Sequence, residues 1–488
     1  MSLLLRNARI VGSGDAPADI LVGGGSIAAI GRGLSGDESV DLEGRFVVPG
    51  LWDNHVHLAQ HALAQRRVDL STTTSAAQAA RLMAEAFRDT PPVAGLPLVG
   101  FGFRDGLWPD APSAALLDSY VDSVPVVLVS GDLHCCWLNS IALARFGYGG
   151  HATGILREDE AFPVTAALQD VPDAVLDAWV DEAAQAAAAR GIVGVVDFEM
   201  ADNIPAWSRR FAAGFDSLRV AAAVYTEHLE GAIAAGRFTG EVIAGTDGLL
   251  TMGPFKVLID GSLNTRTAYC ADVYPGLEHS DRAHGILTVP GDELTALMIR
   301  ASAAGLLPAV HAIGDEANRI ALDSFEVVGC RGRIEHAQLL LDADLPRFAA
   351  LGVAASVQPE QAMDDRGVAD RYWAGRTGRA FALRSLLSAG AELLLGSDAP
   401  VAPLDPWVTF AAAIGRSRDG LEPWHPEQAI SAAEALAAST NGRSRVSAGD
   451  AADLVVVEHD PLAVAADDIR RMPVTATMLA GRWSFSAL

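Results

Sequence analysis

The sequence is nearly without lysine, poor in cysteine and without long apolar runs. Only one of its 36 basic residues is a lysine, Lys256, and its 61 acidic residues leave a formal net charge of −25. An acidic chain without a basic cluster is unsuited to nucleic acid, because binding there needs Lys and Arg to neutralise phosphates. No apolar run reaches the ~18 residues of a transmembrane helix, so we expect no membrane association.

The four cysteines show no metal-binding or redox spacing. Cys135 and Cys136 are adjacent, Cys270 and Cys330 stand alone, and no C-x-x-C pattern occurs. This usage is typical of reduced thiols. The first residues also lack the basic segment and apolar core of a secretory signal, so we expect a cytoplasmic protein.

The middle of the chain alternates short apolar strands with Ala-rich helical stretches, which is the pattern of a parallel α/β fold. Eight strands are predicted, at residues 51–57, 192–198, 218–225, 254–260, 306–311, 333–336, 353–358 and 393–398. Eight strands with intervening helices predict a (β/α)₈ TIM barrel.

The two chain ends and one long gap do not follow this rhythm. Both ends contain short strands broken by Gly-rich turns, which predict a small β-sandwich domain built from residues 1–50 and 440–488. The barrel then occupies residues 51–439. After its first strand we expect an inserted subdomain at about 60–170, with strands at 98–103 and 126–129 and a helix near 138–146.

Residue types that bind metals stand at the carboxyl ends of several predicted strands. His55 and His57 end the first, and because residues i and i+2 of a strand share a face, both imidazoles can reach one ion. His311, His336 and Asp398 end the fifth, sixth and eighth strands. Taken singly, each His can be a hydrogen-bonded core residue, and Asp398 can be a helix N-cap. Together they predict a site for Zn²⁺ or a similar ion, because strand ends of a parallel barrel converge at one mouth.

These residues lie in motifs at 49–57, at Lys256 with 260–263, and at 311–315, 335–337 and 396–400. In set and order the motifs resemble those of the metal-dependent amidohydrolase superfamily, and among its branches the one that contains N-substituted formamide deformylase. The resemblance extends to 449–456 near the chain end and to 137–140 in the insertion. Trp52, Asn264 and Thr265 depart from the usual pattern, but none is an expected ligand.

The resemblance implies a role for each matching residue. His55 and His57 would bind one divalent ion, His311 and His336 a second, and Asp398 would bind the first ion and act as general base. Zinc is the expected metal. The implied reaction is hydrolysis of an amide-type C–N bond in an N-acyl amine, N-formyl amine or cyclic amide. Metal-bound hydroxide would attack, and Asp398 would pass its proton to the leaving nitrogen.

Lys256 lies inside a predicted strand among apolar neighbours, where lysine is rare. A neutral lysine amine can add CO₂ and become an anionic ligand with two oxygens, whereas an arginine stays protonated. The resemblance implies that Lys256 carries such a carbamate and bridges the two metal ions.

Other functions fit the residues less well. No Ser has Gly at both −2 and +2, so the nucleophile elbow of α/β hydrolases is absent. A mononuclear deaminase of the same superfamily typically carries a Glu three residues after the fifth-strand His, where Gly314 stands. A metal-free barrel serving as a scaffold usually lacks several ligands, and here every expected ligand is present.

The substrate is less well defined than the metal site. Trp108, His134, Trp137 and Arg266 are candidate substrate-binding residues, and aromatic groups there favour a substrate with an apolar part. Each of these side chains can equally be a packing residue of the inserted subdomain. We expect a small-molecule substrate, with neither nucleic acid nor membrane as partner; formation of a homo-oligomer stays open.

Overall fold

The structure is a computed structural model that describes the chain except for residues 1, 15, 104, 106–107, 132–134 and 158–159. It divides into two compact units, one formed by Met1–Leu58 with Asp181–Leu488 and the other by Ala59–Val180. Within the described residues, no helix is both long and apolar enough to cross a membrane. The same residues contain no disulfide.

The first unit contains a parallel sheet of eight strands that follow one another in chain order. They are β6 (Leu51–Val56), β12 (Ile192–Asp197), β13 (Arg219–Tyr225), β14 (Leu250–Leu258), β15 (Pro308–Ala312), β16 (Gly332–His336), β17 (Val353–Val357) and β18 (Leu393–Leu395). A parallel bridge between Val56 and Ala399, just beyond β18, nearly closes the sheet. The predicted barrel is therefore confirmed, with strand ends displaced by no more than four residues.

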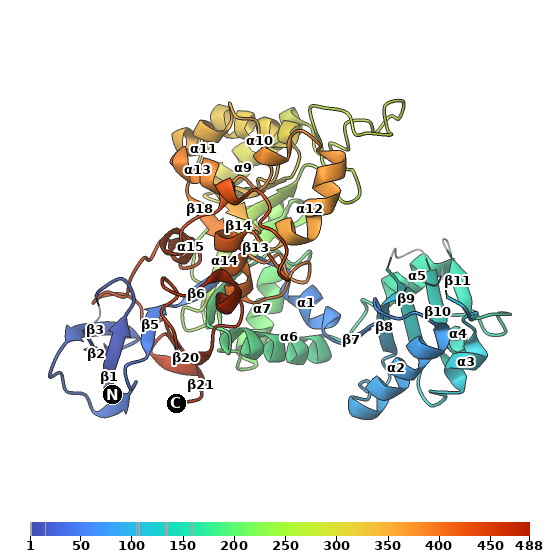
Figure 1. The fold of residues 1–488 in the computed structure, drawn as a ribbon, viewed down its shortest axis with the longest axis horizontal. Coiled ribbons are helices and arrows are strands. Elements are labelled where there is room, and N and C mark those ends of the chain that lie inside the picture. The colour runs from blue at the N-terminus through green and yellow to red at the C-terminus, as the bar shows by residue number, and fades with distance from the viewer. Residues whose placement is uncertain (1, 15, 104, 106–107, 132–134, 158–159) are drawn as a thin grey trace. The chain divides into compact units, whose positions relative to one another are not determined.

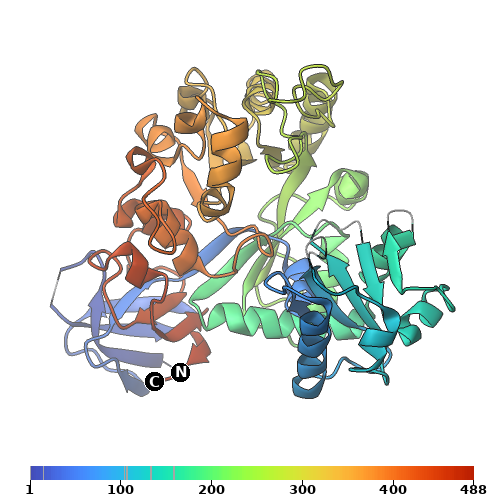
Figure 2. The ribbon, with the colours of Figure 1, turned by 45° about the vertical axis from the view of Figure 1, so that its right-hand side comes forward.

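Helices alternate with these strands and cover the outside of the barrel (Figures 1 and 2). They include α7 (Asn203–Ala212), α8 (Thr226–Ala234), α9 (Gly291–Ala303), α10 (Asp315–Val328), α11 (Leu345–Leu351), α12 (Gln361–Tyr372), α13 (Leu383–Ser388), α14 (Pro406–Gly415) and α15 (Ala432–Ala438). The core forms where strand residues such as Val310 and Ile334 meet Leu322 and Phe325 of α10. This apolar layer holds the strands in place and therefore their carboxyl ends, where the polar residues stand.

Both chain ends join one further eight-stranded sheet. It contains β1 (Ser2–Ile10), β2 (Ala18–Gly23), β3 (Ser26–Gly31), β4 (Glu38–Asp41), β5 (Phe46–Pro49), β19 (Leu454–Val457), β20 (Val474–Leu479) and β21 (Arg482–Ser486). Antiparallel pairing of β5 with β19 connects the two ends, which lie close together in Figures 1 and 2. The short, largely exposed β4 was not predicted, because it lacks an apolar face. The domain boundaries at 1–50 and 440–488 stay a prediction.

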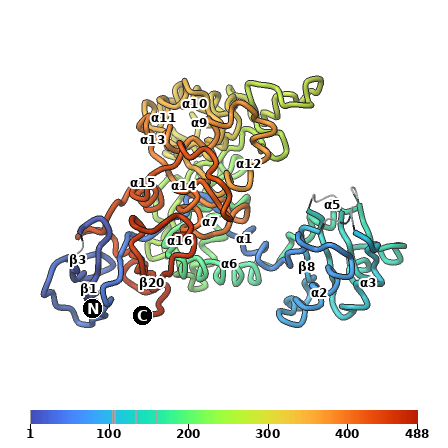
Figure 3. Tube along the Cα trace, viewed as in Figure 1, coloured from blue at the N-terminus to red at the C-terminus, as the bar shows by residue number. Residues whose placement is uncertain are grey.

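The second unit has its own five-stranded sheet, in the order β11 (Ile155–Arg157), β10 (Cys135–Leu138), β9 (Val126–Ser130), β8 (Leu98–Phe103) and β7 (Arg67–Asp69). Helices α2 (Ala76–Asp89), α3 (Ala114–Asp118), α4 (Ser140–Arg145) and α5 (Ala161–Ala167) accompany it. The chain enters through α1 (Leu58–Ala64) and leaves through α6 (Asp173–Ala188) (Figure 3). The predicted helix at 138–146 is shorter in the structure, because Asn139 caps α4 through its side chain and Leu138 belongs to β10.

Candidate metal centre

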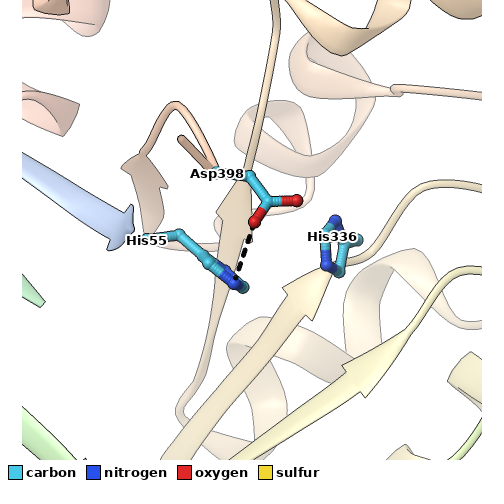
Figure 4. A group of neighbouring side chains, drawn as sticks. All are labelled: His55, His336 and Asp398. Carbon is cyan, nitrogen blue, oxygen red and sulfur yellow. Dashed lines mark ion pairs between the residues drawn. The ribbon is translucent and has the colours of Figure 1, made fainter. Parts of the chain in front are cut away.

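The predicted ligands come together at the carboxyl ends of the barrel strands. His55 lies in β6, His311 in β15 and His336 at the end of β16, and Asp398 follows β18. Figure 4 shows His55, His336 and Asp398 facing one another, and one potential ligand atom from each lies within 4.8 Å of the others. This is the geometry expected of residues that share a metal ion.

The distances extend this cluster to the other two histidines. Asp398 Oδ1 lies 3.4 Å from His57 Nε2 and 3.6 Å from His55 Nε2. The ring centroids of His336 and His311 are 4.5 Å apart, and those of His336 and His55 are 5.1 Å apart. Four imidazoles and one carboxylate therefore form a single cluster.

Lys256 lies in β14 and is almost completely buried. Its Nζ atom lies 4.4 Å from the centre of the Phe198 ring, but it has no hydrogen-bond partner among the described residues. The Nδ1 atoms of His57 and His336 are likewise buried and unsatisfied there. A buried polar atom without a partner is costly, and nitrogen and carboxylate groups are the ligands that Zn²⁺ prefers. The residues present therefore fit a divalent metal ion.

The protonation states also suit metal binding. Burial lowers the pKa of Lys256 to about 8, and burial together with the Lys256 charge lowers the pKa of His55 to about 3. Burial would raise the pKa of Asp398, but the His55 and His57 imidazoles hold it well below its usual range. For His57, burial lowers the pKa, but the hydrogen bond to Asp398 and the charges of Asp398 and Glu199 together outweigh burial and raise it. The centre thus combines an anionic carboxylate with neutral His55, the forms that bind cations.

Two carboxylates that the sequence reasoning did not assign hold the ligand-bearing segments in place. Asp53 Oδ1 accepts hydrogen bonds from the backbone N–H groups of His55, at 3.1 Å, and Ser397, at 2.9 Å, so it links the first strand to the last. Asp260 accepts from the N–H groups of Ile313 and Gly314, just after His311. Since Asp53 is two residues from His55 on the same strand, spacing alone could have indicated it.

The backbone beside His55 leaves no room for a side chain at Gly396, where an added Cβ would lie 2.7 Å from the His55 nitrogen. Gln361 Nε2, from helix α12, donates to Asp398 Oδ2 at 2.7 Å. No sequence signal marks Gln361, because it reaches Asp398 only through the tertiary fold. Asp398 therefore has one oxygen tied to Gln361 and the other directed to the histidines.

The candidate substrate residues lie in different surroundings. Arg266 follows β14 and stacks on the Tyr372 ring at 5.3 Å. Trp137 is completely buried in the inserted unit, where its Nε1 donates to the Ser113 carbonyl and its ring packs against Trp108. These contacts favour the packing alternative for both indoles. His134 lies outside the described residues.

Comparison with known proteins agrees with this site. The model of the Amidohydrolase family matches residues 38–485. The chain is 26% identical to N-substituted formamide deformylase of Arthrobacter pascens, over 99% of this chain and 97% of that protein. It is 28% identical to the protein LONG AFTER FAR-RED 3 of Arabidopsis thaliana, over 93% of this chain and 83% of that one.

A solved structure, that of an uncharacterized metal-dependent hydrolase from Pyrococcus horikoshii, aligns with 96% of this chain and 99% of its own length. The TM-score is 0.79 and the sequence identity 25%. Three findings agree on the family of this chain. They are the family match over most of the chain, the barrel, and the cluster of side chains suited to metal binding. The chain belongs to the amidohydrolase family, whose members are hydrolases that act on carbon–nitrogen bonds.

Proposed function

We propose that this enzyme hydrolyses an amide-type C–N bond of a small molecule, with an N-formyl or N-acyl amine as the first substrate class to test and a cyclic amide as the second. The name of the Arthrobacter pascens relative supports the N-formyl class. The observation that carries the proposal is a largely buried cluster of four imidazoles and Asp398, with the unpartnered Lys256 amine on the same Phe198 ring as His55.

His55, His57, His311, His336, Lys256 and Asp398 would hold two divalent ions, with zinc as the expected metal. Such ions lower the pKa of a bound water and polarise the carbonyl of the bond to be cleaved. Lys256 suits the bridging role because its pKa of about 8 leaves a useful share of neutral amine near neutral pH. The amine nitrogen would form a bond to the carbon of CO₂ and release one proton, which leaves an anionic carbamate.

Asp398 is the proposed proton carrier. The nearby imidazoles keep the carboxylate ionised, so it is free to receive a proton from an attacking water whose acidity a bound divalent ion would raise. Gln361 orients it through Oδ2, and Oδ1 stays directed to the histidines. Asp398 would then deliver the proton to the leaving nitrogen. Arg266 is the proposed substrate contact on the barrel, while roles for Trp108, His134 and Trp137 in substrate binding stay sequence-based predictions.

The test combines metal analysis with a substrate panel. Purified protein loaded with Zn²⁺ is expected to retain two equivalents after gel filtration and to cleave members of a panel of N-formyl amines, N-acyl amino acids and cyclic amides. Lys256→Arg should lose the bridging ligand and the activity. Activity confined to esters or phosphotriesters would contradict the C–N proposal, and full activity in Lys256→Arg would contradict the bridge.

A further inference from the structure

A continuous chain of buried polar contacts lies behind His55, on the side away from Asp398. Glu335, which is fully buried, accepts a hydrogen bond from His55 Nδ1 with its Oε2 atom at 2.6 Å. Its other oxygen, Oε1, accepts from Arg333 Nε. Arg333 is anchored in turn by the Asn54 carbonyl and by Ser356 Oγ, the latter at 2.8 Å.

The chain of contacts decides where the proton of His55 resides. Glu335 lies between His55 and Arg333, whose guanidinium stays protonated and donates to Oε1, so Glu335 is a carboxylate that only accepts hydrogen bonds. The hydrogen shared with His55 must then sit on Nδ1. This leaves the lone pair of the neutral imidazole on Nε2, the atom that lies 3.6 Å from Asp398 Oδ1 in the ligand cluster.

Arg333 keeps this arrangement rigid in two ways. Its guanidinium connects three strands, since it contacts Asn54 of β6, Glu335 of its own strand β16 and Ser356 of the adjacent strand β17. It also lies over the Phe198 ring at 5.4 Å, and the His55 ring packs on the same Phe198 at 4.6 Å. His55 is therefore held by a hydrogen bond at one edge and by an aromatic contact at its face.

We infer that Glu335 and Arg333 are positioning residues, which fix the tautomer and the orientation of His55 so that Nε2 is available to a metal ion. The inference rests on the proposed function, because His55 must be a ligand for its tautomer to matter. Carboxylates that receive the second N–H of a metal-binding histidine raise its basicity, and their loss typically weakens metal binding by about 10- to 100-fold.

The experiment measures the Zn²⁺ dissociation constant by competition with a chelator, together with the thermal unfolding midpoint of the metal-free protein. Glu335→Ala is expected to weaken binding by about 10- to 100-fold. Glu335→Gln, which keeps an acceptor oxygen, should recover part of that loss. Equal weakening in both variants would overturn the tautomer role, because charge alone would then matter.

A matched control separates positioning from stability. Asp453 forms a two-hydrogen-bond pair with Arg219, at 2.8 and 3.1 Å, and is also nearly buried, but neither residue contacts a proposed ligand. Asp453→Ala should lower the unfolding midpoint and leave the dissociation constant unchanged. A Glu335→Ala protein that binds Zn²⁺ as tightly as the wild type would overturn the inference.

If Glu335→Ala does not fold, Arg333→Lys takes its place. Lysine keeps the charge but cannot span the same three acceptors, so binding should weaken several-fold, to a lesser extent than in the alanine variant. An unchanged dissociation constant would again overturn the inference. Failure of the wild type to bind any divalent ion would instead count against the proposed function, so the two failures are distinguishable.

Discussion

Two buried polar side chains, one in each compact unit, differ in how fully their hydrogen-bonding groups are satisfied. In the inserted unit, Asn139 uses its amide fully. Its oxygen accepts from the N–H groups of Val126 and Ala142, and its nitrogen donates to the carbonyls of Val121 and Val124. In the barrel, the Lys256 amine is just as inaccessible and has no hydrogen-bond partner among the described residues.

The difference separates a structural role from a functional one. A buried polar group contributes to stability when every donor and acceptor is matched, and it costs stability when they are not. Asn139 closes a junction between a strand and a helix. Lys256 carries an unmatched donor at a cost, which is expected where a ligand supplies the missing partner.

The largest expected effect comes from Lys256→Met, which keeps an unbranched side chain, one atom shorter, but removes the amine. We expect kcat/KM to fall at least ~10³-fold, because several kcal/mol of metal-assisted stabilisation are lost. The metal-free protein should at the same time become more stable by about 1–3 kcal/mol, since an unmatched buried donor is removed. Steady-state kinetics and urea unfolding check the two effects. If the variant lost stability as well as activity, Lys256 would contribute to stability as Asn139 does, and the proposed difference between the two residues would be wrong.

Asn139→Ala is expected to act in the opposite sense, on stability without chemistry at the metal centre. It leaves four backbone groups without their partner, which should destabilise the inserted unit by about 3 kcal/mol or more. Hydrogen exchange of β9 and α4 measures this loss. Asn139→Asp keeps the acceptor oxygen and should cost less. Equal exchange in wild type and Asn139→Ala would contradict the structural role.

Removal of the metal compares the barrel with the inserted unit in the wild-type protein, without a substitution. Metal at 100 times its dissociation constant should stabilise the barrel by about 2.7 kcal/mol, because only the folded site binds it. Chelation should therefore speed exchange of the β15 and β16 amides and leave those of β9 unaffected. Identical responses in the two units would show that the metal does not bind where the four histidines meet.

The smallest effect concerns a half-buried ion pair outside these two buried sites. Glu434 caps α15 through Ser431 and pairs with Arg384 at 2.6 Å; the hydrogen bonds from these residues lower its pKa to about 2. Because the folded pKa lies below the unfolded one, the stabilisation is present above about pH 4.5 and is lost as the pH falls toward 2. Solvent screening keeps it to about 0.5–1 kcal/mol.

Glu434→Gln should therefore lower the urea midpoint at pH 7 and leave it nearly unchanged close to pH 2. A difference that grows toward low pH would have the wrong sign and would contradict this assignment. Comparing this change in the free energy of unfolding with those at Lys256 and Asn139 shows how strongly burial alters the energetic effect of a polar group.

The sequence by itself determined the eight barrel strands and the cluster at their ends. Strands and helices follow from local periodic patterns in the sequence. The carboxyl ends of all strands in a parallel barrel lie at the same end of the barrel, so histidines at those ends come close together. Lys256 was predictable for the same reason, because a lysine inside an apolar strand is conspicuous. Candidate ligands such as His55 and Asp398 could thus be named without knowing which atoms are in contact.

Only the tertiary structure decided the hydrogen-bond partners of those side chains. The Glu335 contact to His55 joins residues 280 positions apart, and Gln361 reaches Asp398 from a helix after another strand. The same holds for Trp137, whose burial depends on how the inserted unit packs. Local pattern encodes which side of an element is buried, but the choice of one hydrogen-bond partner depends on distances that exist only once the strands have closed into a barrel.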